Sequence, residues 1–148
     1  MAEVAVIYGS KSDEGVMKEA FDILTEFEVK FESAVLSAHR QPEKTVEFAK
    51  TAESKGIKVI IAGAGLAAAL PGVIASHTKL PVIGVPVAGG SLNGVDALYS
   101  IVQMPKGIPV AAVGISNAKN AALLAVQILA LSDSDLARKI TEYRKNFR

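Results

Sequence analysis

The chain reads Val59-Ile60-Ile61-Ala62-Gly63-Ala64-Gly65 near its middle, and this stretch decides the fold. Its first four residues are all apolar, without the alternation of a strand that has one face in water. An unbroken apolar strand is typical of a parallel sheet whose two faces are both covered by helices. The glycines that follow let a ligand approach the backbone closely. We therefore expect a central strand over residues 59–62 and a glycine loop over residues 63–65.

The segments on either side of this strand alternate between strand and helix patterns. The other strands that we expect are 3–8, 30–36, 82–85 and 108–113. The first expected helix begins at Ser12 or Asp13 and ends near 27, and the others cover 43–55, 70–77, 94–103, 118–131 and, as a last amphipathic helix, 133–148. These repeated units predict an α/β fold with a parallel sheet and helices on both faces. At this length we expect a single domain, residues 1–148.

Charge and composition exclude several classes of protein. Sixteen basic residues oppose fifteen acidic ones, so we expect neither a nucleic-acid partner nor a membrane-surface patch. The apolar stretch 59–90 contains Pro71, Pro81 and Pro86, which would break a membrane-spanning helix. The absence of cysteine excludes disulfides and argues against structural zinc, and no cluster has metal-ligand spacing. With no basic leader before the first strand, we expect a cytoplasmic protein without a bound metal.

Polar or glycine-rich loops follow four of the expected strands, at residues 9–13, 37–40, 63–65 and 88–91. In a doubly wound parallel sheet, ligands bind outside the carboxyl ends of the strands, where the strand order reverses. All four loops would lie at that edge. Their position predicts a site for a small molecule.

The loop Ser37-Ala38-His39-Arg40 carries the strongest chemical signal. Arg40 offers a planar pair of donors suited to phosphate or carboxylate. His39 is a candidate for proton transfer, because histidine is the residue type that most often gives and takes protons near neutrality. A plain surface loop with two polar side chains is the competing interpretation. The only other histidine, His77, is interpreted as a surface residue at a helix end.

The loop after the first strand, Gly9-Ser10-Lys11-Ser12-Asp13, precedes a helix whose free N–H groups favour anions. The simpler interpretation is a capped helix. Asp13 could instead accept hydrogen bonds from a pair of sugar hydroxyls. The loop is not a P-loop, because the Gly-Lys-Ser/Thr ending and the glycine spacing are missing.

Residues 63–68 match the dinucleotide-binding pattern G-x-G-x-x-A after a strand. The acidic residue expected about 20 positions later is missing, since residues 83–86 read Ile-Gly-Val-Pro. Pro71 also disturbs the helix that this pattern should open. The pattern therefore does not support a nicotinamide cofactor.

Several longer motifs occur in a fixed order along nearly the whole chain. They are Gly9-Ser10-Lys11-Ser12-Asp13, Ser37-Ala38-His39-Arg40 with Pro42, Ile61-Ala62-Gly63-Ala64-Gly65, Leu70-Pro71-Gly72, the run 80–87, Leu92 with Gly94 and Asp96, the run 100–105 and the run 120–125. In this order they resemble the N5-carboxyaminoimidazole ribonucleotide mutase family, the catalytic subunit of phosphoribosylaminoimidazole carboxylase in purine biosynthesis.

This resemblance implies a three-layer flavodoxin-like fold with sheet order 2-1-3-4-5, assembled as a homo-octamer with sites at subunit boundaries. It implies a ribonucleotide substrate, whose N5 carbamate is moved to C4 of the imidazole, and no cofactor. His39 matches the acid–base histidine of the family. The substrate-binding positions that it implies are Ser10, Ser12, Ser37 and Arg40 near the phosphate, Asp13 at the ribose, Gly63, Ala64 and Gly65 around the carboxylate and CO2, and Leu70. The apolar helix 118–131 also favours assembly over a lone monomer.

The chain departs from the family at four positions. Bacterial mutases usually read Gly-Gly-Ala-Ala-His-Leu-Pro-Gly where residues 65–72 read Gly-Leu-Ala-Ala-Ala-Leu-Pro-Gly, so Leu66 replaces a glycine and Ala69 replaces a second histidine. They commonly have serine where this chain has Gly89 and Ala97. Related carboxylases that use free CO2 directly also lack a histidine at the position of Ala69, although their surrounding loop differs. We favour the mutase and keep direct carboxylation as the alternative.

A non-enzymatic flavodoxin-like binding domain is a third hypothesis. A receiver domain would need an acidic cluster and a phosphorylatable aspartate at the sheet edge, but the first strand leads into Gly9 and Ser10. A flavin carrier would bring aromatic side chains to stack on the flavin, and the chain has no tryptophan and three tyrosines.

Overall fold

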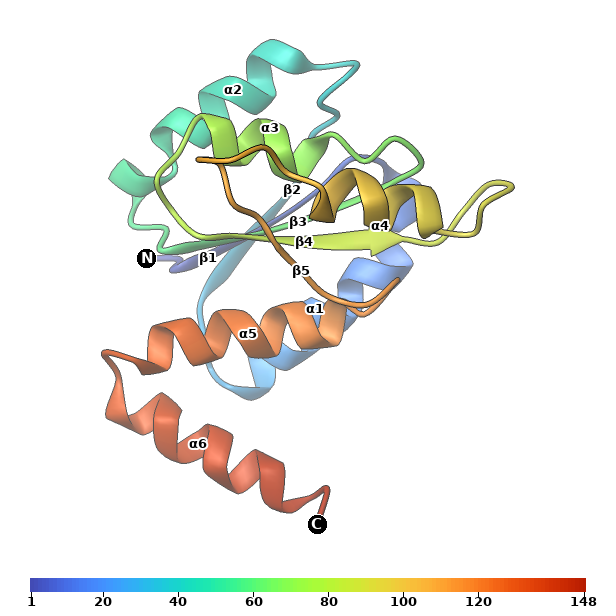
Figure 1. The fold of residues 1–148 in the computed structure, drawn as a ribbon. Coiled ribbons are helices and arrows are strands. Elements are labelled where there is room, and N and C mark those ends of the chain that lie inside the picture. The colour runs from blue at the N-terminus through green and yellow to red at the C-terminus, as the bar shows by residue number, and fades with distance from the viewer.

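The computed structural model describes residues 1–148 and contains a five-stranded parallel sheet in the order β2-β1-β3-β4-β5 (Figure 1). The strands are β1 (Val4–Tyr8), β2 (Phe31–Val35), β3 (Val59–Gly65), β4 (Val82–Val87) and β5 (Ala111–Ala112). The helices are α1 (Glu14–Glu26), α2 (Pro42–Thr51), α3 (Leu70–Ser76), α4 (Val95–Val102), α5 (Ala118–Ala130) and α6 (Ser134–Lys145), with 3-10 turns η1 (Lys11–Asp13) and η2 (Glu53–Lys55).

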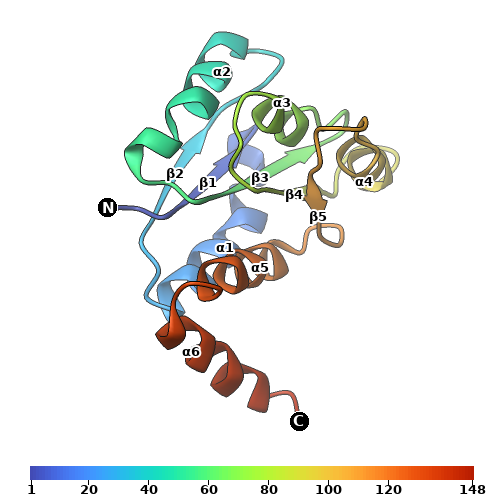
Figure 2. The ribbon, with the colours of Figure 1, turned by 60° about the vertical axis from the view of Figure 1, so that its left-hand side comes forward.

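Helices cover both faces of the sheet (Figures 1 and 2). One face carries α2, α3 and α4, the other carries α1 and α5, and α6 packs outside α5. Alternate residues of β1 serve different cores: Val4 and Val6 pack in the cluster with α1 and α5, whereas Ala5 and Ile7 pack in the cluster with the other helices. This arrangement confirms the predicted three-layer α/β fold and its strand order.

The central strand β3 is longer than predicted. Gly63 pairs with Tyr8 on one side and with Val85 on the other, and Gly65 pairs with Val87. β1 pairs with β3 as far as Gly63, and β4 continues the ladder to Gly65, so the strand extends through both glycines. The prediction of a loop over 63–65 is therefore wrong, and the chain leaves the sheet at Leu66.

The last strand β5 is shorter than the predicted 108–113 and contains only Ala111 and Ala112. It lies at the edge of the sheet and pairs with β4 alone. Pro109 has no N–H to donate to that ladder, so the apolar run before Ala111 stays outside the sheet.

Several helix ends follow the predicted signals. Pro42 lies in the first turn of α2, and Gly56, at φ 94°, ends the 3-10 turn that follows this helix. The predicted helix 43–55 is therefore an α-helix to Thr51 and then a 3-10 turn. Asp133 begins α6 because its carboxylate accepts hydrogen bonds from the N–H groups of Asp135 and Leu136, at 3.0 and 3.2 Å. None of these helices has the length and apolar character needed to cross a bilayer.

Candidate functional site

The loop after β1 is fixed by strands on both sides. The Gly9 N–H donates to the Gly63 carbonyl at 3.1 Å, and the Leu36 N–H donates to the Tyr8 carbonyl at 2.9 Å. The next residue, Ser10, accepts hydrogen bonds at its Oγ from the Ser12 N–H (3.3 Å) and the Ser12 hydroxyl (2.9 Å). Ser10 therefore caps the 3-10 turn η1, whereas Asp13, the residue before α1, makes no capping hydrogen bond with its side chain, so the predicted cap of the first helix by Ser12 or Asp13 is wrong.

The loop after β2 is held by Arg40. The Oγ of Ser37 accepts hydrogen bonds from the backbone N–H and the Nε–H of Arg40, both at 3.1 Å. The Nη2 of Arg40 donates to the carbonyl of Gly9 at 3.1 Å, across 31 residues of sequence. The guanidinium group thus joins the loops after β1 and β2 and keeps its Nη1 free for a ligand.

These two loops enclose a hollow of about 390 Å³ at the carboxyl ends of β1 and β2. Its lining residues are Gly9, Ser10, Lys11, Val35, Ser37, Arg40 and Gln41. Two of these residues are cationic, none is acidic, and two carry hydroxyl groups. Such a set of donors suits a phosphate group. The structure therefore brings together three of the predicted substrate-binding residues, namely Ser10, Ser37 and Arg40.

Asp13 lies at the end of η1 and is buried, with 9% of its surface exposed. Burial raises the pKa of its carboxyl group, while a backbone hydrogen bond at Ser10 and the nearby positive charge of Arg40 act in the opposite direction. A raised pKa means that the folded state disfavours the charged form. Ionised Asp13 therefore lowers the free energy of unfolding, but it places a carboxylate beside the hollow.

Replacing Asp13 by Asn is expected to raise the free energy of unfolding at about pH 7. The stabilising contribution of a group with a raised pKa is present below its unfolded pKa and is lost as the pH rises through its folded pKa. Asn does not ionise, so the variant avoids this loss. Urea unfolding at about pH 7 and about pH 3 checks the prediction: the difference between variant and wild type should vanish at the lower pH, and a variant less stable at pH 7 would contradict it.

His39 lies in the exposed turn 38–40 and is not among the residues that line the hollow. Its imidazole makes no hydrogen bond to another residue of the chain, so the ring is free to turn toward a ligand. Its neighbour Arg40 contributes to the hollow directly. The structure thus places the predicted acid–base group beside the predicted phosphate site, on the same turn.

The predicted positions on and after β3 are less accessible. Gly63 is buried under Met17, and a Cβ on it would lie 2.4 Å from the Met17 Sδ. Ala64 and Leu70 are 7% and 2% exposed, and both belong to the core cluster with α2, α3 and α4. Only Gly65 is partly exposed at the end of the strand. Packing of α1 explains the glycine at 63, and substrate contact by these four residues stays a prediction.

Sequence reasoning missed four residues of the hollow: Gly9, Lys11, Val35 and Gln41. Lys11 could have been found, because it stands between two serines that the sequence had already indicated. Gln41 is fixed by two backbone-directed bonds: its N–H donates to the Ser37 carbonyl at 2.7 Å and its Oε1 accepts from the Ser37 N–H at 3.3 Å. Nothing in the sequence distinguishes Val35 from the rest of its strand.

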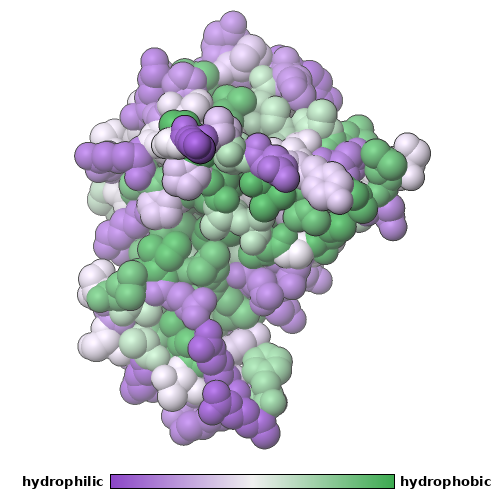
Figure 3. All heavy atoms as spheres, viewed as in Figure 1, coloured by the Kyte–Doolittle hydropathy of each residue, from purple (hydrophilic) through white to green (hydrophobic).

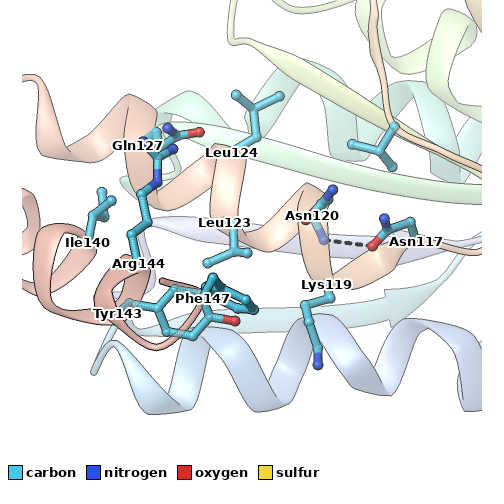
Figure 4. Close-up of a pocket in the computed structure, with 11 residues that line it drawn as sticks. Asn117, Lys119, Asn120, Leu123, Leu124, Gln127, Ile140, Tyr143, Arg144 and Phe147 are labelled. Carbon is cyan, nitrogen blue, oxygen red and sulfur yellow. Dashed lines mark hydrogen bonds between the residues drawn. The ribbon is translucent and has the colours of Figure 1, made fainter.

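A larger hollow, about 630 Å³, lies between α5 and α6 (Figure 4). The rings of Tyr143 and Phe147 lie beside Leu123, with Arg144 next to Gln127. No residue from the loops after β1, β2 or β3 lines it. We place the candidate site in the smaller hollow, because that one lies at the carboxyl ends of β1 and β2, next to the β1/β3 switch point of the sheet, and collects the anion-binding groups.

Three comparisons with known proteins agree with one another. The profile of the AIR carboxylase family matches residues 3–148. The N5-carboxyaminoimidazole ribonucleotide mutase of Pyrococcus abyssi is 57% identical over 148 residues, covering 100% of this chain and 85% of that protein. The mutase of Bacillus subtilis is 58% identical over 145 residues, covering 97% and 90%. The crystal structure of Treponema denticola PurE superposes with a TM-score of 0.88 at 33% identity, covering 97% of this chain and 89% of that one.

Proposed function

The chain belongs to the AIR carboxylase family, and from this premise we propose that it converts N5-carboxyaminoimidazole ribonucleotide to 4-carboxyaminoimidazole ribonucleotide in purine biosynthesis. The observation that carries the proposal is identity of 57% to a mutase over the whole chain. The hollow between the loops after β1 and β2 supports it, because it offers cations and hydroxyls for a phosphate group.

In this proposal the phosphate of the ribonucleotide occupies that hollow. The free Nη1 of Arg40, the hydroxyls of Ser10 and Ser37, and the ammonium group of Lys11 are its donors. Ser12 supports Ser10 through their 2.9 Å hydrogen bond. The carboxylate of Asp13 accepts hydrogen bonds from the hydroxyl groups of the ribose.

His39 carries the proton in the proposed reaction. The N–C bond of the carbamate breaks, CO2 is released, and the nitrogen receives a proton from the imidazolium. C4 of the ring then attacks the carbon of CO2. After the new C–C bond has formed, C4 is tetrahedral and carries both the carboxylate and its original hydrogen. The neutral imidazole removes that proton, and the ring regains its aromaticity. The imidazolium gives one proton to the nitrogen, and the imidazole takes one proton back from C4. A single histidine can therefore serve both steps, and no cofactor is consumed.

The direct CO2-using carboxylase remains a second candidate because of Ala69. This residue immediately precedes α3 and is partly buried, so it offers neither a proton nor a hydrogen bond from its side chain. The test compares initial rates with N5-carboxyaminoimidazole ribonucleotide and with aminoimidazole ribonucleotide plus bicarbonate. We expect turnover of the carbamate at a far higher kcat/KM, and the opposite order would make the protein a carboxylase.

We also propose that the protein assembles as a homo-octamer and works in the cytoplasm, where its phosphorylated substrate is retained. The apolar helix α5, which the sequence suggested as a reason for assembly, does not supply the contact surface between copies. Its residues Ala121, Ala125 and Val126 are already fully buried in the core with α1. The exposed apolar face belongs to α4, where Val95, Tyr99 and Val102 are 42%, 61% and 49% exposed. Figure 3 shows hydrophobic surface gathered over α4 and the loop before it. A second copy of the chain is the proposed occupant of this face.

The double variant Tyr99→Lys, Val102→Lys is expected to break the assembly, because it places two positive charges on the face that a neighbouring copy would cover. Both positions lie toward the end of α4, where cations do not oppose the helix dipole. The matched control is Leu131→Lys, at a leucine that is 89% exposed outside this face. Sedimentation velocity should give about eight times 15.4 kDa for the wild type and the control and a smaller mass for the double variant. An unchanged mass in the double variant would reject this face as the interface.

A further inference from the structure

Tyr8 is a buried titratable residue that the proposed reaction does not use. It is the last residue of β1, and only 3% of its surface is exposed. Its hydroxyl donates a hydrogen bond to Oε1 of Glu14 at 3.1 Å. Burial, and then this bond with Glu14, raise the pKa of the Tyr8 hydroxyl. The hydroxyl therefore stays protonated near neutrality and remains a donor to the carboxylate.

The bond between Tyr8 and Glu14 joins the two ends of a loop at the candidate site. Tyr8 is the residue before the loop 9–13, and Glu14 is the residue after it. This loop supplies three of the residues that line the hollow. In the sheet, Tyr8 pairs with Val35, which also lines the hollow. The bond thus lies beside the hollow, although neither of its two residues is part of the lining.

Glu14 stands one turn from Lys11, whose ammonium group is a proposed phosphate donor. The Glu14 N–H donates to the Lys11 carbonyl at the end of η1. Side chains three residues apart in a 3-10 turn lie above one another, and a carboxylate and an ammonium group at this spacing commonly form an ion pair. None of the ion pairs in the structure includes either residue. The Glu14 carboxylate is bonded to Tyr8 instead.

This choice of partner matters for the charge of the hollow. Its cations are Lys11 and Arg40, and no acidic residue lines it. A Glu14 carboxylate paired with Lys11 would compete with a phosphate group for the ammonium protons. It would also bring a negative charge toward a phosphate that is itself negative, and like charges repel. An anion site next to Glu14 therefore requires that this carboxylate be held elsewhere.

We propose that Tyr8 is a positioning residue for phosphate binding: its hydroxyl holds the Glu14 carboxylate away from Lys11 and keeps that ammonium group free for the phosphate of the ribonucleotide. This inference rests on the proposed function, because it concerns the same phosphate. Tyr8 touches no atom of the substrate in this account and acts only through the two charged residues. Because the hydrogen bond is already formed in the free protein, the ammonium group is available before the ligand arrives.

Tyr8→Phe removes the hydroxyl and keeps the ring that packs near Phe21, with ring centroids 6.4 Å apart in the wild type. The freed carboxylate should pair with Lys11, so the Kd for aminoimidazole ribonucleotide should rise about three- to tenfold. Calorimetric titration measures this change. The loss should shrink at high ionic strength, because salt screens exposed charges. The corresponding nucleoside has no phosphate, so its Kd should be the same for variant and wild type.

Glu14→Gln provides the decisive second background. Glutamine keeps an oxygen that can accept a hydrogen bond from Tyr8, but it has no charge that could pair with Lys11. In this background Tyr8→Phe should leave the nucleotide Kd unchanged, and the double-mutant cycle isolates the charge of Glu14. A hydroxyl that merely fixes the shape of the loop would give the same loss in both backgrounds. The matched control is Tyr143→Phe, between α5 and α6, which should keep the wild-type Kd.

Three outcomes would overturn the inference: an unchanged nucleotide Kd in Tyr8→Phe, an equal loss when Glu14 is replaced by Gln, or an equal loss with the nucleoside. A wild-type protein that binds no aminoimidazole ribonucleotide would instead overturn the proposed function, and this inference with it.

Discussion

Replacing His39 by Asn is expected to lower kcat by about 10³-fold while the Kd for the ribonucleotide changes by less than about threefold. Asparagine is polar and of similar size, but it does not titrate near neutrality. The imidazole makes no hydrogen bond within the chain and does not line the hollow, so its loss should leave both the turn 38–40 and the phosphate contacts intact. Single-turnover kinetics measure the first quantity, and calorimetric titration with aminoimidazole ribonucleotide measures the second.

The control for this variant is His77→Asn, at the exposed residue that follows α3. It removes the only other imidazole of the chain and should keep the wild-type kcat. Parallel loss of turnover and binding in the His39 variant would assign that residue a structural role. Retention of turnover would remove it from the reaction altogether.

Replacing Arg40 by Ala is expected to weaken ribonucleotide binding by about 10- to 100-fold, which corresponds to roughly 1.5–3 kcal/mol for a lost charge-assisted hydrogen bond. Two effects act together. The variant loses a cationic donor to the phosphate, and it loses the bond from Nη2 to the Gly9 carbonyl that holds the two loops at their spacing. Arg40→Lys keeps the charge without the planar pair of donors, so an intermediate affinity is expected.

The phosphate itself provides the control for Arg40. The corresponding nucleoside lacks the group that Arg40 is proposed to bind, so its affinity should be nearly the same for the wild type and for Arg40→Ala. Calorimetric titrations with nucleotide and nucleoside form a double-mutant cycle that isolates this one interaction. An equal loss with both ligands would mean that Arg40 acts on the fold of the loops and not on phosphate.

Much of the fold could be predicted from the sequence because its signals are local. The unbroken apolar run at 59–62 indicated a strand covered on both faces, and Pro42 and Asp133 marked helix starts that the structure contains. The errors arose where a neighbour decides the outcome. β3 continues through Gly65 because β1 pairs with it as far as Gly63 and β4 pairs with it to its end, and β5 is short because Pro109 removes a donor on an edge strand.

The candidate site shows the same division. Ser37 and Arg40 could be selected from their chemistry and from their place after a strand. That Arg40 reaches the carbonyl of Gly9, 31 residues away, depends on the pairing of β1 with β2 and could not be found locally. Substrate contact by Gly63 stays a prediction, and the structure adds a requirement that the sequence did not indicate, because a Cβ at this position would clash with Met17.

The central claim is that the phosphate of a ribonucleotide is held between the loops after β1 and β2 while the His39 imidazole reaches its heterocycle. A crystal structure with bound 4-carboxyaminoimidazole ribonucleotide tests this most directly. We predict the phosphate within hydrogen-bond distance of Arg40 and Ser10, and the ring of His39 turned to C4. A phosphate bound elsewhere, for example in the hollow between α5 and α6, or an imidazole separated from C4 by other residues, would contradict the account.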